Sequence, residues 1–350
     1  MSENRKLKIA YIELDTHPDI LSNFYELMRD SEIFEVSYFL SAKISKIFNV
    51  QNSAIRIVDE KNVVQILQEK PWDLVVIGTV HRYFNVFSKI VKQFPTAIIV
   101  HNLEFSKSSK QNLTSSIVKE DALYRLKLAT KEGLFSMNSV YENAKTLFVL
   151  DQKFENSKYL FLPLFFVKST NTQNSEVFKV VVPGAVSQKR RDYKRILNQI
   201  LKFTKPTEFV LLGKSQGEEL KWIMETKKHL PNHIQIVYFT EKVPQEHYDS
   251  ILKSANVLWS PIQIETEFFS QKEWYGKTKL SGNIGDAIKF AKPAVFPKKY
   301  QSDFPFIFSE ESDIETQLHD VSNSNIDWNS FSKEKVQKAL EETLLEAIKI

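Results

Sequence analysis

Three stretches in the second half of the chain combine glycine, positive charge and the start of a predicted helix. The first runs from Pro183 to Tyr193 and contains three consecutive cations, Lys189, Arg190 and Arg191. Positive side chains and the unpaired N–H groups of a helix N-terminus both attract anions. This stretch therefore predicts a diphosphate site, with a solvated run of charges as the alternative interpretation.

The other two stretches place small residues before a helix. Residues 213–217 include one cation, Lys214, but lack the Walker A spacing and the GxGxxG pattern, so a plain turn is the alternative. Residues 275–287 hold three of the eight glycines and two lysines, one of which is Lys279. Asp286 can accept a hydrogen bond from a ribose hydroxyl. The alternative interpretation is an acidic residue that the helix dipole stabilises near the helix N-terminus. Backbone N–H groups for a phosphate would come from Ser281, Gly282 and Asn283.

All three stretches follow short apolar runs, which alternate with amphipathic segments along the whole chain. This alternation predicts an α/β protein with parallel sheets. Ligands of such sheets bind at the carboxyl ends of the strands, so the polar residues just after the strands are the candidates for function. Strands are expected at residues 7–14, 34–40, 72–77, 97–100 and 146–150, and again at 178–182, 208–212, 234–239, 257–260 and 294–296.

A change in composition divides the chain into two domains. Residues 161–176 contain a proline and a polar run of Ser, Thr, Asn and Gln, which is typical of a linker. We expect an N-terminal domain over 1–165, a linker over 166–177, a second domain over 178–327 and a final helical segment over 328–350. The predicted fold class is two Rossmann-like, doubly wound α/β domains.

Composition and charge exclude several classes of protein. Of the 350 residues, 42% are hydrophobic and 26% are charged, as in an ordinary globular protein. The absence of cysteine excludes disulfides, thiolate metal sites and a cysteine nucleophile. A net charge of +4 is too small for a nucleic-acid binder. The N-terminus lacks a signal-peptide pattern and no apolar run reaches the roughly 20 residues of a membrane span, so a cytoplasmic protein is expected.

Four elements of the second half occur in the order of a known family. They are Gly184 with the cations at 190–191, then residues 211–214, then 237–261, and finally the segment from Gly282 to Val295. In this order they resemble the nucleotide-sugar-binding domain of GT-B glycosyltransferases, particularly those similar to family 4. In the first half the resemblance rests mainly on residues 100–104. It implies that the two domains face a cleft and that the final helix packs back on the first domain.

The resemblance implies that a nucleotide diphosphate sugar binds to the second domain. The family commonly has an Arg directly after the first glycine and a Lys six residues later, where this chain has Ala185 and Arg191. Arg190 or Lys214 could supply the missing cation. No DxD metal signature is present, and the resemblance implies a metal-independent enzyme with no cofactor beyond its donor substrate. The implied donor-binding residues are Gly184, Arg190, Arg191, Lys214, Lys242, Val243, Lys279, Ser281, Gly282, Asn283 and Asp286.

One acidic position of the family is missing. Its paired glutamates lie eight residues apart, and the corresponding positions here hold Thr278 and Asp286. A literal pair at that spacing, Glu265 and Glu273, precedes the glycine loop and is interpreted as a coincidence. Retaining and inverting stereochemistry therefore both stay open.

The resemblance further implies that the first domain holds a glycan or glycolipid acceptor. An inverting transfer needs a general base near neutral pKa, which a histidine or a carboxylate can provide. His17 is the first choice, paired with Asp15 or Glu104, and His101 is a further candidate. Each could instead be a loop histidine that caps a helix. His81 and Arg82 could bind an anionic acceptor.

Two other functions and a membrane-facing surface are also compatible with the sequence. A nucleotide-sugar epimerase and a non-catalytic nucleotide-sugar or glycan-binding protein are the alternatives, the latter favoured by Thr278. A peripheral membrane contact is also considered, with buried phenylalanines beside solvated lysines as the alternative. Its face would consist of Phe84, Phe87, Phe105 and Tyr124 with Lys89, Lys92, Lys107 and Lys110.

Overall fold

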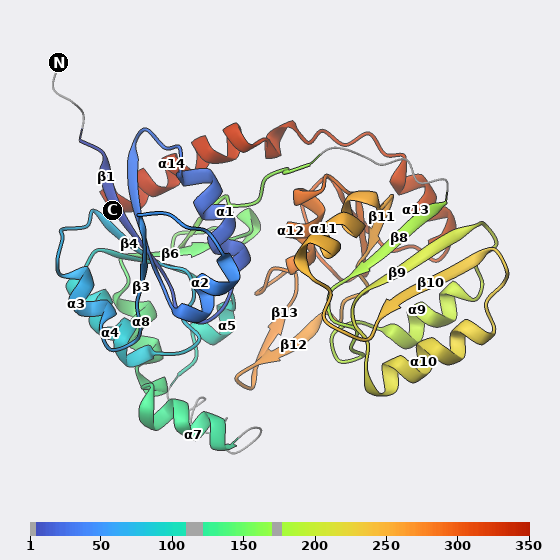
Figure 1. Ribbon diagram of the computed structural model, residues 1–350, viewed down its shortest axis with the longest axis horizontal. Helices are drawn as coiled ribbons and strands as arrows, with labels where there is room; N and C mark the ends of the chain where they lie inside the picture. Colours follow the sequence, from blue (N-terminus) through green and yellow to red (C-terminus); the bar gives the residue numbers. More distant parts are fainter. Residues whose placement is uncertain (1–4, 110–121, 170–176) are drawn as a thin grey trace. The chain divides into compact units, whose positions relative to one another are not determined.

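The computed structural model describes residues 5–109, 122–169 and 177–350 and divides into two compact units (Figure 1). Unit 1 consists of Met1–Leu164 with Glu267–Glu273 and Lys333–Ile350. Unit 2 consists of Phe165–Thr266 and Trp274–Ser332. Each unit has its own parallel sheet and its own core, and each is described by itself.

Unit 1 is built on a seven-stranded parallel sheet with the strand order β3-β2-β1-β4-β5-β6-β7. Its strands are β1 (Leu7–Glu13), β2 (Phe34–Leu40), β3 (Ile55–Ile57), β4 (Leu74–Ile77), β5 (Thr96–Ile99), β6 (Thr146–Val149) and β7 (Tyr159–Phe161). The strand predicted at 146–150 is not the last of this sheet, because β7 pairs beyond it. β4 and β5 are buried throughout, as expected for strands covered on both faces.

The helices of unit 1 follow the strands in the alternating order of a doubly wound fold. They are α1 (Pro18–Met28), α2 (Ala42–Phe48), α3 (Val63–Leu67), α4 (Phe84–Gln93), α5 (Leu103–Ser106), α7 (Ala122–Lys131), α8 (Met137–Asn143) and α14 (Lys333–Lys349), with short 3₁₀ turns at Leu134–Ser136 and Gln152–Phe154. α14 comes from the end of the chain, and its Glu341 accepts a 2.6 Å hydrogen bond from Ser31.

Unit 2 repeats the plan with six parallel strands in the order β10-β9-β8-β11-β14-β15. They are β8 (Phe178–Pro183), β9 (Thr207–Lys214), β10 (Ile234–Phe239), β11 (Val257–Trp259), β14 (Ala294–Phe296) and β15 (Ile307–Ser309). The helices are α9 (Tyr193–Ile200), α10 (Gly217–Lys228), α11 (Gln245–Ser254), α12 (Gly282–Lys289) and α13 (Ile314–Ser322), with a 3₁₀ turn at Asn329–Phe331.

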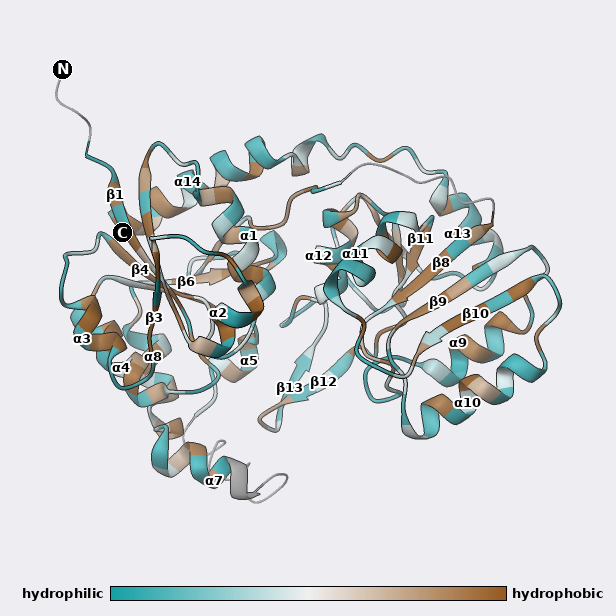
Figure 2. Cartoon of the chain, viewed as in Figure 1, coloured by the Kyte–Doolittle hydropathy of each residue, from teal (hydrophilic) through white to brown (hydrophobic). Residues whose placement is uncertain are grey.

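The core of each unit follows from its apolar periodicity. In α9 the buried residues are Tyr193, Ile196, Leu197 and Ile200, a spacing that places all four on one helix face. That face packs on the sheet with Phe209 and Trp259, both fully buried. In Figure 2 the central strands of both sheets are coloured mainly as hydrophobic.

A two-stranded hairpin was not predicted. It is formed by β12 (Glu265–Phe268) and β13 (Gln271–Trp274), and its tip, Glu267–Glu273, belongs to unit 1. Of the predicted linker, Val167 and Lys168 donate backbone hydrogen bonds to Phe331 and Lys289 of unit 2. Residues 170–176 of that linker lie outside the described residues.

Within the described ranges, no helix is both long enough and apolar enough to cross a membrane.

Candidate functional site

Each sheet has one place where the strand order reverses, and polar residues gather there. In unit 1 the chain runs outward through β1, β2 and β3 and then returns to the other side of β1 with β4. In unit 2 the same reversal occurs between β8 and β11. Ligands of open α/β sheets bind at such switch points, outside the carboxyl ends of the strands. The two switch points are therefore the candidate sites.

The switch point of unit 1 holds three histidines from three different loops. His17 follows β1, His81 follows β4 and His101 follows β5. The rings of His17 and His101 are stacked with centroids 4.0 Å apart, and His81 lies edge-on with its centroid 5.8 Å from each of them. The sequence identified these loops as candidates, and the parallel sheet brings them into one cluster.

Hydrogen bonds fix the protonation pattern of two of these rings. Nε2 of His101 lies 2.8 Å from the carbonyl oxygen of Gly78, which can only accept, so His101 carries a proton on Nε2. The side-chain nitrogen of Asn102 lies 3.2 Å from Nε2 of His81 and can only donate, so that atom of His81 accepts. Neutral His81 therefore carries its proton on Nδ1, and neutral His101 has its basic lone pair on Nδ1.

The predicted carboxylate partners of His17 have other contacts. Asp15 forms ion pairs with Lys43 at 3.2 Å and with Arg82 at 3.5 Å. Glu104 forms an ion pair with Lys107 at 3.1 Å. The Nδ1 atom of His17 lies 4.0 Å from Oδ1 of Asp19.

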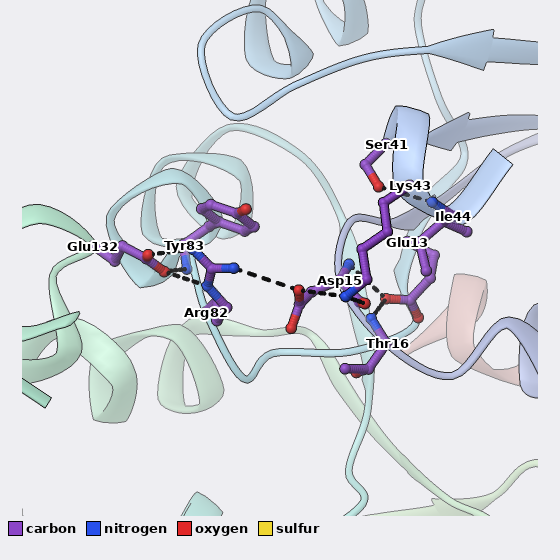
Figure 3. A network of polar contacts seen from close by, with 9 residues as sticks. All are labelled: Glu13, Asp15, Thr16, Ser41, Lys43, Ile44, Arg82, Tyr83 and Glu132. Carbon is purple, nitrogen blue, oxygen red and sulfur yellow. Dashed lines mark hydrogen bonds and ion pairs between the residues drawn. The ribbon is translucent and has the colours of Figure 1, made fainter. Parts of the chain in front are cut away.

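Arg82 lies between two carboxylates rather than open to an anion (Figure 3). Its guanidinium donates to Glu132 through Nε and Nη2, at 3.1 and 2.6 Å, and faces Asp15 on the other side. The hydrogen bond to Glu132 raises the pKa of Arg82 further above its usual range. Glu132 also accepts from the backbone N–H of Tyr83, which holds the whole loop after β4 in place.

A buried acid, Glu13, lies at the same switch point and was not identified from the sequence. It is the last residue of β1 and is fully buried. Its carboxyl group accepts from the Thr79 hydroxyl at 2.9 Å and from the backbone N–H groups of Asp15 and Thr16 at 3.4 and 3.3 Å. Burial raises the pKa of Glu13 to about 8, against the opposing effect of the Thr79 hydrogen bond. Glu13 thus ties the loop after β1 to the loop after β4.

A cavity of about 350 Å³ lies beside this network, at the carboxyl ends of β1, β2 and β3. Its apolar lining includes Ile57 and the ring of Tyr83. Its charged lining consists of Lys43, Asp59 and Glu60, so carboxylates outnumber cations. Aromatic and aliphatic surface combined with carboxylate acceptors suits a neutral ligand rich in hydroxyl groups.

The switch point of unit 2 has a different composition. Its glycines allow neighbouring backbone segments and the Arg191 side chain to approach one another closely. Gly184 directly follows β8 and has φ of +95°, and a side chain there would overlap the guanidinium of Arg191. Gly213 passes so near the carbonyl oxygen of Gly184 that it too could carry no Cβ. These contacts explain why glycine is needed just after β8 and near the end of β9.

Arg191 is buried, and its hydrogen-bond partners among the described residues are neutral. Its Nη2 donates to the side-chain oxygen of Asn283 at 3.1 Å, and its Nη1 donates to the carbonyl oxygen of Ala185 at 3.2 Å. Among the described residues no carboxylate pairs with it, and its buried Nε has no partner. Asn283 in turn donates to Ser260 after β11 at 2.8 Å, so this network spans the switch point.

α12 begins beside this network. Ser281 is the N-cap, and its hydroxyl accepts from the backbone N–H of Asn283 at 3.3 Å. Gly282 is exposed, and a Cβ added there would meet open space. On the first turns of this helix, Asp286 accepts a 3.0 Å hydrogen bond from Tyr248, so one of its oxygens is already engaged.

The remaining predicted donor residues lie around the same sheet edge. Lys214 is the last residue of β9 and is exposed, as are Arg190 after β8 and Lys242 after β10. Val243 packs against the unit 2 core. The ammonium group of Lys279 lies 5.7 Å from the ring centroid of Tyr275. The structure thus joins Gly184, Arg191 and Asn283 directly and places the exposed cations near the strand ends.

The predicted membrane-facing surface is wrong in its apolar part. Phe84, Phe87 and Phe105 are buried, because α4 and α5 pack these rings inward and leave Lys89, Lys92 and Lys107 in solvent. The side chain of Tyr124 and the whole of Lys110 lie outside the described residues. Within the described ranges, no group of three or more His, Asp or Glu residues could hold a metal ion.

Comparison with known proteins identifies the fold but not a family. No family model matches the sequence, and no curated protein matches it. Anabaena HepE, solved in complex with UDP, matches with a TM-score of 0.60 at 12% identity and covers 97% of this chain and 100% of its own. The UDP-GlcNAc 2-epimerase of Methanocaldococcus jannaschii matches with a TM-score of 0.55 at 14% identity, covering 97% and 100%. The lipopolysaccharide outer core galactosyltransferase WaaB matches with a TM-score of 0.56 at 9% identity, covering 97% and 99%.

The chain has the GT-B fold. The prediction of two Rossmann-like, doubly wound domains is confirmed by these matches over nearly the whole chain and by the two parallel sheets.

Proposed function

We propose that this protein is a glycosyltransferase that moves a sugar from a nucleotide diphosphate donor to a glycan or glycolipid acceptor. One observation carries the proposal. The guanidinium of Arg191 is buried at the switch point of unit 2, next to the start of α12, and no carboxylate among the described residues pairs with it. A buried charge normally requires a counter-charge, and a diphosphate supplies one. The resemblance to family 4 in the same segments supports this placement.

In this proposal the donor binds to unit 2. Its diphosphate lies near Arg191, with Arg190, Lys214, Lys242 and Lys279 as further cations, and it accepts from the backbone N–H groups at the start of α12. Gly184 and Gly213 let the backbone approach the phosphates. Asp286, which Tyr248 orients, accepts a hydrogen bond from a ribose hydroxyl, and Val243 contacts the nucleotide base. These groups neutralise the leaving diphosphate, so the reaction requires neither a metal ion nor a cofactor.

The acceptor is proposed to bind to unit 1. The cavity beside Tyr83 offers an apolar wall and carboxylates for the hydroxyl groups of a sugar. His17, stacked on His101, acts as general base, while Asp15 and Glu104 shape the surrounding loops. The acceptor oxygen attacks the anomeric carbon and gives its proton to the histidine as the bond from that carbon to the diphosphate oxygen breaks. A histidine base suits a single displacement with inversion. Thr278 replaces the family's acid, and its hydroxyl instead accepts from the backbone N–H of Trp274 at 2.9 Å.

Epimerisation of a nucleotide sugar is the second candidate, because the fold is shared with UDP-GlcNAc 2-epimerases. An epimerase needs acid and base groups around the bound sugar, and the histidine cluster could supply them. A non-catalytic binding protein would bind the donor with no turnover.

A two-stage experiment separates these functions. A thermal-shift screen against UDP, GDP, ADP, CMP and their sugars first identifies the nucleotide. The preferred nucleotide sugar is then incubated with the protein, with and without oligosaccharide acceptors. Acceptor-dependent release of nucleoside diphosphate supports transfer, whereas a new sugar isomer without release supports epimerisation. Binding with no product indicates a binding protein, and no stabilisation by any nucleotide contradicts the proposal.

A further inference from the structure

The hairpin tip Glu267–Glu273 has a backbone that its sequence does not favour. Phe269 and Ser270 form the turn with φ of +50° and +57°. Two-residue turns with both φ values positive normally hold Asn-Gly or Asp-Gly, because the Cβ of other residues clashes with the backbone in the left-handed region. Contacts elsewhere in unit 1 must therefore hold this turn.

The turn is anchored by an arginine and an aromatic ring. Nη1 of Arg125 donates to the Ser270 hydroxyl at 2.6 Å, and the Arg125 guanidinium lies 5.9 Å from the Phe269 ring centroid. The Phe269 ring also packs against Phe105, with centroids 5.2 Å apart. Arg125 belongs to α7 and Phe105 to α5, so the tip is held by two elements of unit 1.

The strands on either side of the turn carry contacts that reach the histidine cluster. The ring of Phe268 packs on His81 with centroids 4.5 Å apart and an angle of 48° between the planes. It also meets Phe105 edge-on at 4.9 Å. Phe268 is therefore the aromatic wall against which His81 is oriented.

Glu273 reaches the same histidine indirectly. It is fully buried, and its carboxylate accepts from the backbone N–H groups of Phe105 at 2.8 Å and Glu104 at 3.4 Å. These N–H groups are in the first turn of α5, immediately after Asn102. Asn102 is the residue whose amide donates to Nε2 of His81 at 3.2 Å. Glu273 thus fixes the segment that sets the proton position of His81.

We propose that Phe268 and Glu273 are positioning residues of the candidate active site, which fix the orientation and tautomer of His81. Both act through His81, one by direct packing and the other through α5 and Asn102. The tip belongs to unit 1, whereas the chain on either side of it belongs to unit 2, so a segment from late in the sequence contributes to the site of unit 1. The catalytic meaning of this inference rests on the proposed function, whereas its structural content does not.

The first test uses the unaltered protein. Two-dimensional ¹H–¹⁵N spectra of the imidazole rings report the tautomer of each histidine, and His81→Gln identifies the His81 signals. With the Asn102 amide nitrogen 3.2 Å from Nε2, we expect neutral His81 to carry its proton on Nδ1. A neutral His81 that is protonated on Nε2 would overturn the proposal without reference to catalysis.

The second test uses the variants Phe268→Leu and Glu273→Gln, with Glu267→Gln as the matched control. Glu267 is a glutamate of the same hairpin with an exposed side chain. We expect signals of His81 protonated on Nε2 to appear in each test variant, because the Asn102 amide no longer holds a fixed position against the ring, while the signals of exposed His229 stay unchanged. The control should leave His81 unaltered.

Measurements of folding and of nucleotide binding complete the design. Far-UV circular dichroism confirms that each variant is folded, and Glu273→Asp replaces Glu273→Gln if the latter is not. Unchanged UDP affinity with an altered His81 supports a role confined to unit 1. An unaltered His81 in folded Phe268 and Glu273 variants contradicts the proposal. Failure of the proposed function would instead appear as absent UDP binding or turnover, which these spectra do not depend on.

Discussion

The two switch points occupy equivalent places in their sheets, but the residues of their loops differ in chemical type. In unit 1 the loops carry titratable side chains: three histidines within 5.8 Å of one another and the buried acid Glu13. In unit 2 they carry glycines, hydroxyls and an amide around one buried arginine. The first arrangement suits the movement of protons, and the second suits the neutralisation of a phosphate.

Two arginines show the difference most clearly. Arg82 of unit 1 lies between Glu132 and Asp15, so its charge is balanced by the protein itself. Arg191 of unit 2 donates to a carbonyl and an amide oxygen and has no recorded carboxylate partner in the described chain. An anionic acceptor at Arg82 would have to compete with two carboxylates, whereas an anionic donor at Arg191 would not. The surrounding charges decide which arginine is available to a ligand.

Replacing His17, the proposed base of unit 1, should have the largest effect on turnover. His17→Asn keeps a residue that tolerates the left-handed backbone at φ of +58° but removes the imidazole. We expect the turnover number for sugar transfer to fall about 100-fold or more, with unchanged affinity for the nucleoside diphosphate. Steady-state kinetics and calorimetry measure the two quantities. His229→Asn, an exposed histidine of unit 2, is the control and should retain full turnover.

Replacing the unpaired arginine should affect binding instead. Arg191→Ala removes a charge-assisted phosphate contact worth about 1.5–3 kcal/mol, which corresponds to an increase of about 10- to 150-fold in the dissociation constant. Calorimetric titration with the nucleoside diphosphate chosen by the thermal-shift screen measures this increase. Lys189→Ala changes an exposed cation two residues away and should have little effect. Equal affinity in the Arg191 variant would place the diphosphate elsewhere.

The buried acid should make the stability of the protein depend on pH. Because the folded-state pKa of Glu13 is about 8 and its usual value is 4.5, the folded chain holds a proton between these pH values that the unfolded chain has lost. The stability gained from this proton is complete below the unfolded pKa and is lost as the pH rises toward 8, by up to about 1.4 kcal/mol per pH unit. Glu13→Gln should flatten this part of the profile of unfolding free energy against pH. An identical slope in both proteins from pH 5 to 8 would contradict a buried, protonated Glu13.

The smallest effect is expected on the free energy of unfolding, from a substitution at Ala291 of unit 2. Ala291 follows α12 with φ of +49°, a backbone conformation that favours glycine. Ala291→Gly should raise the free energy of unfolding by up to about 1 kcal/mol, because relief of the left-handed strain exceeds the added chain entropy. Urea denaturation measures this difference. A destabilised variant would mean that contacts of the Ala291 methyl group outweigh the strain.

The sheets could be predicted from the sequence because their strands are short apolar runs. β4, β5 and β8 were expected within one or two residues, since burial on both faces leaves an unbroken hydrophobic signal. The hairpin was missed for the opposite reason. Its strands contain charged residues, and its turn is Phe269-Ser270, which carries no turn signal. Only contacts with distant residues such as Arg125 explain that conformation.

The loops that carry the candidate sites could be predicted from the sequence, but the contacts between their side chains could not. The position of each histidine after a strand was visible, whereas the stacking of His17 on His101 follows only from the order of the strands. Glu13 gave no signal, because its partner Thr79 lies 66 residues away. The interpretation of the Glu265 and Glu273 spacing as a coincidence stays a prediction, yet Glu273 itself is fully buried and bonded to α5.

Hydrogen–deuterium exchange with and without UDP tests the division between the two units most directly. If UDP is not the preferred nucleotide, the nucleoside diphosphate selected by the thermal-shift screen takes its place. Our account predicts slower exchange in peptides that contain residues 183–192, 213–217 and 281–287 of unit 2. Peptides that contain residues 13–17, 78–83 and 101–106 of unit 1 should change less. Protection confined to the unit 1 peptides, with none at the start of α12, would contradict the assignment of phosphate binding to unit 2 and of proton transfer to unit 1.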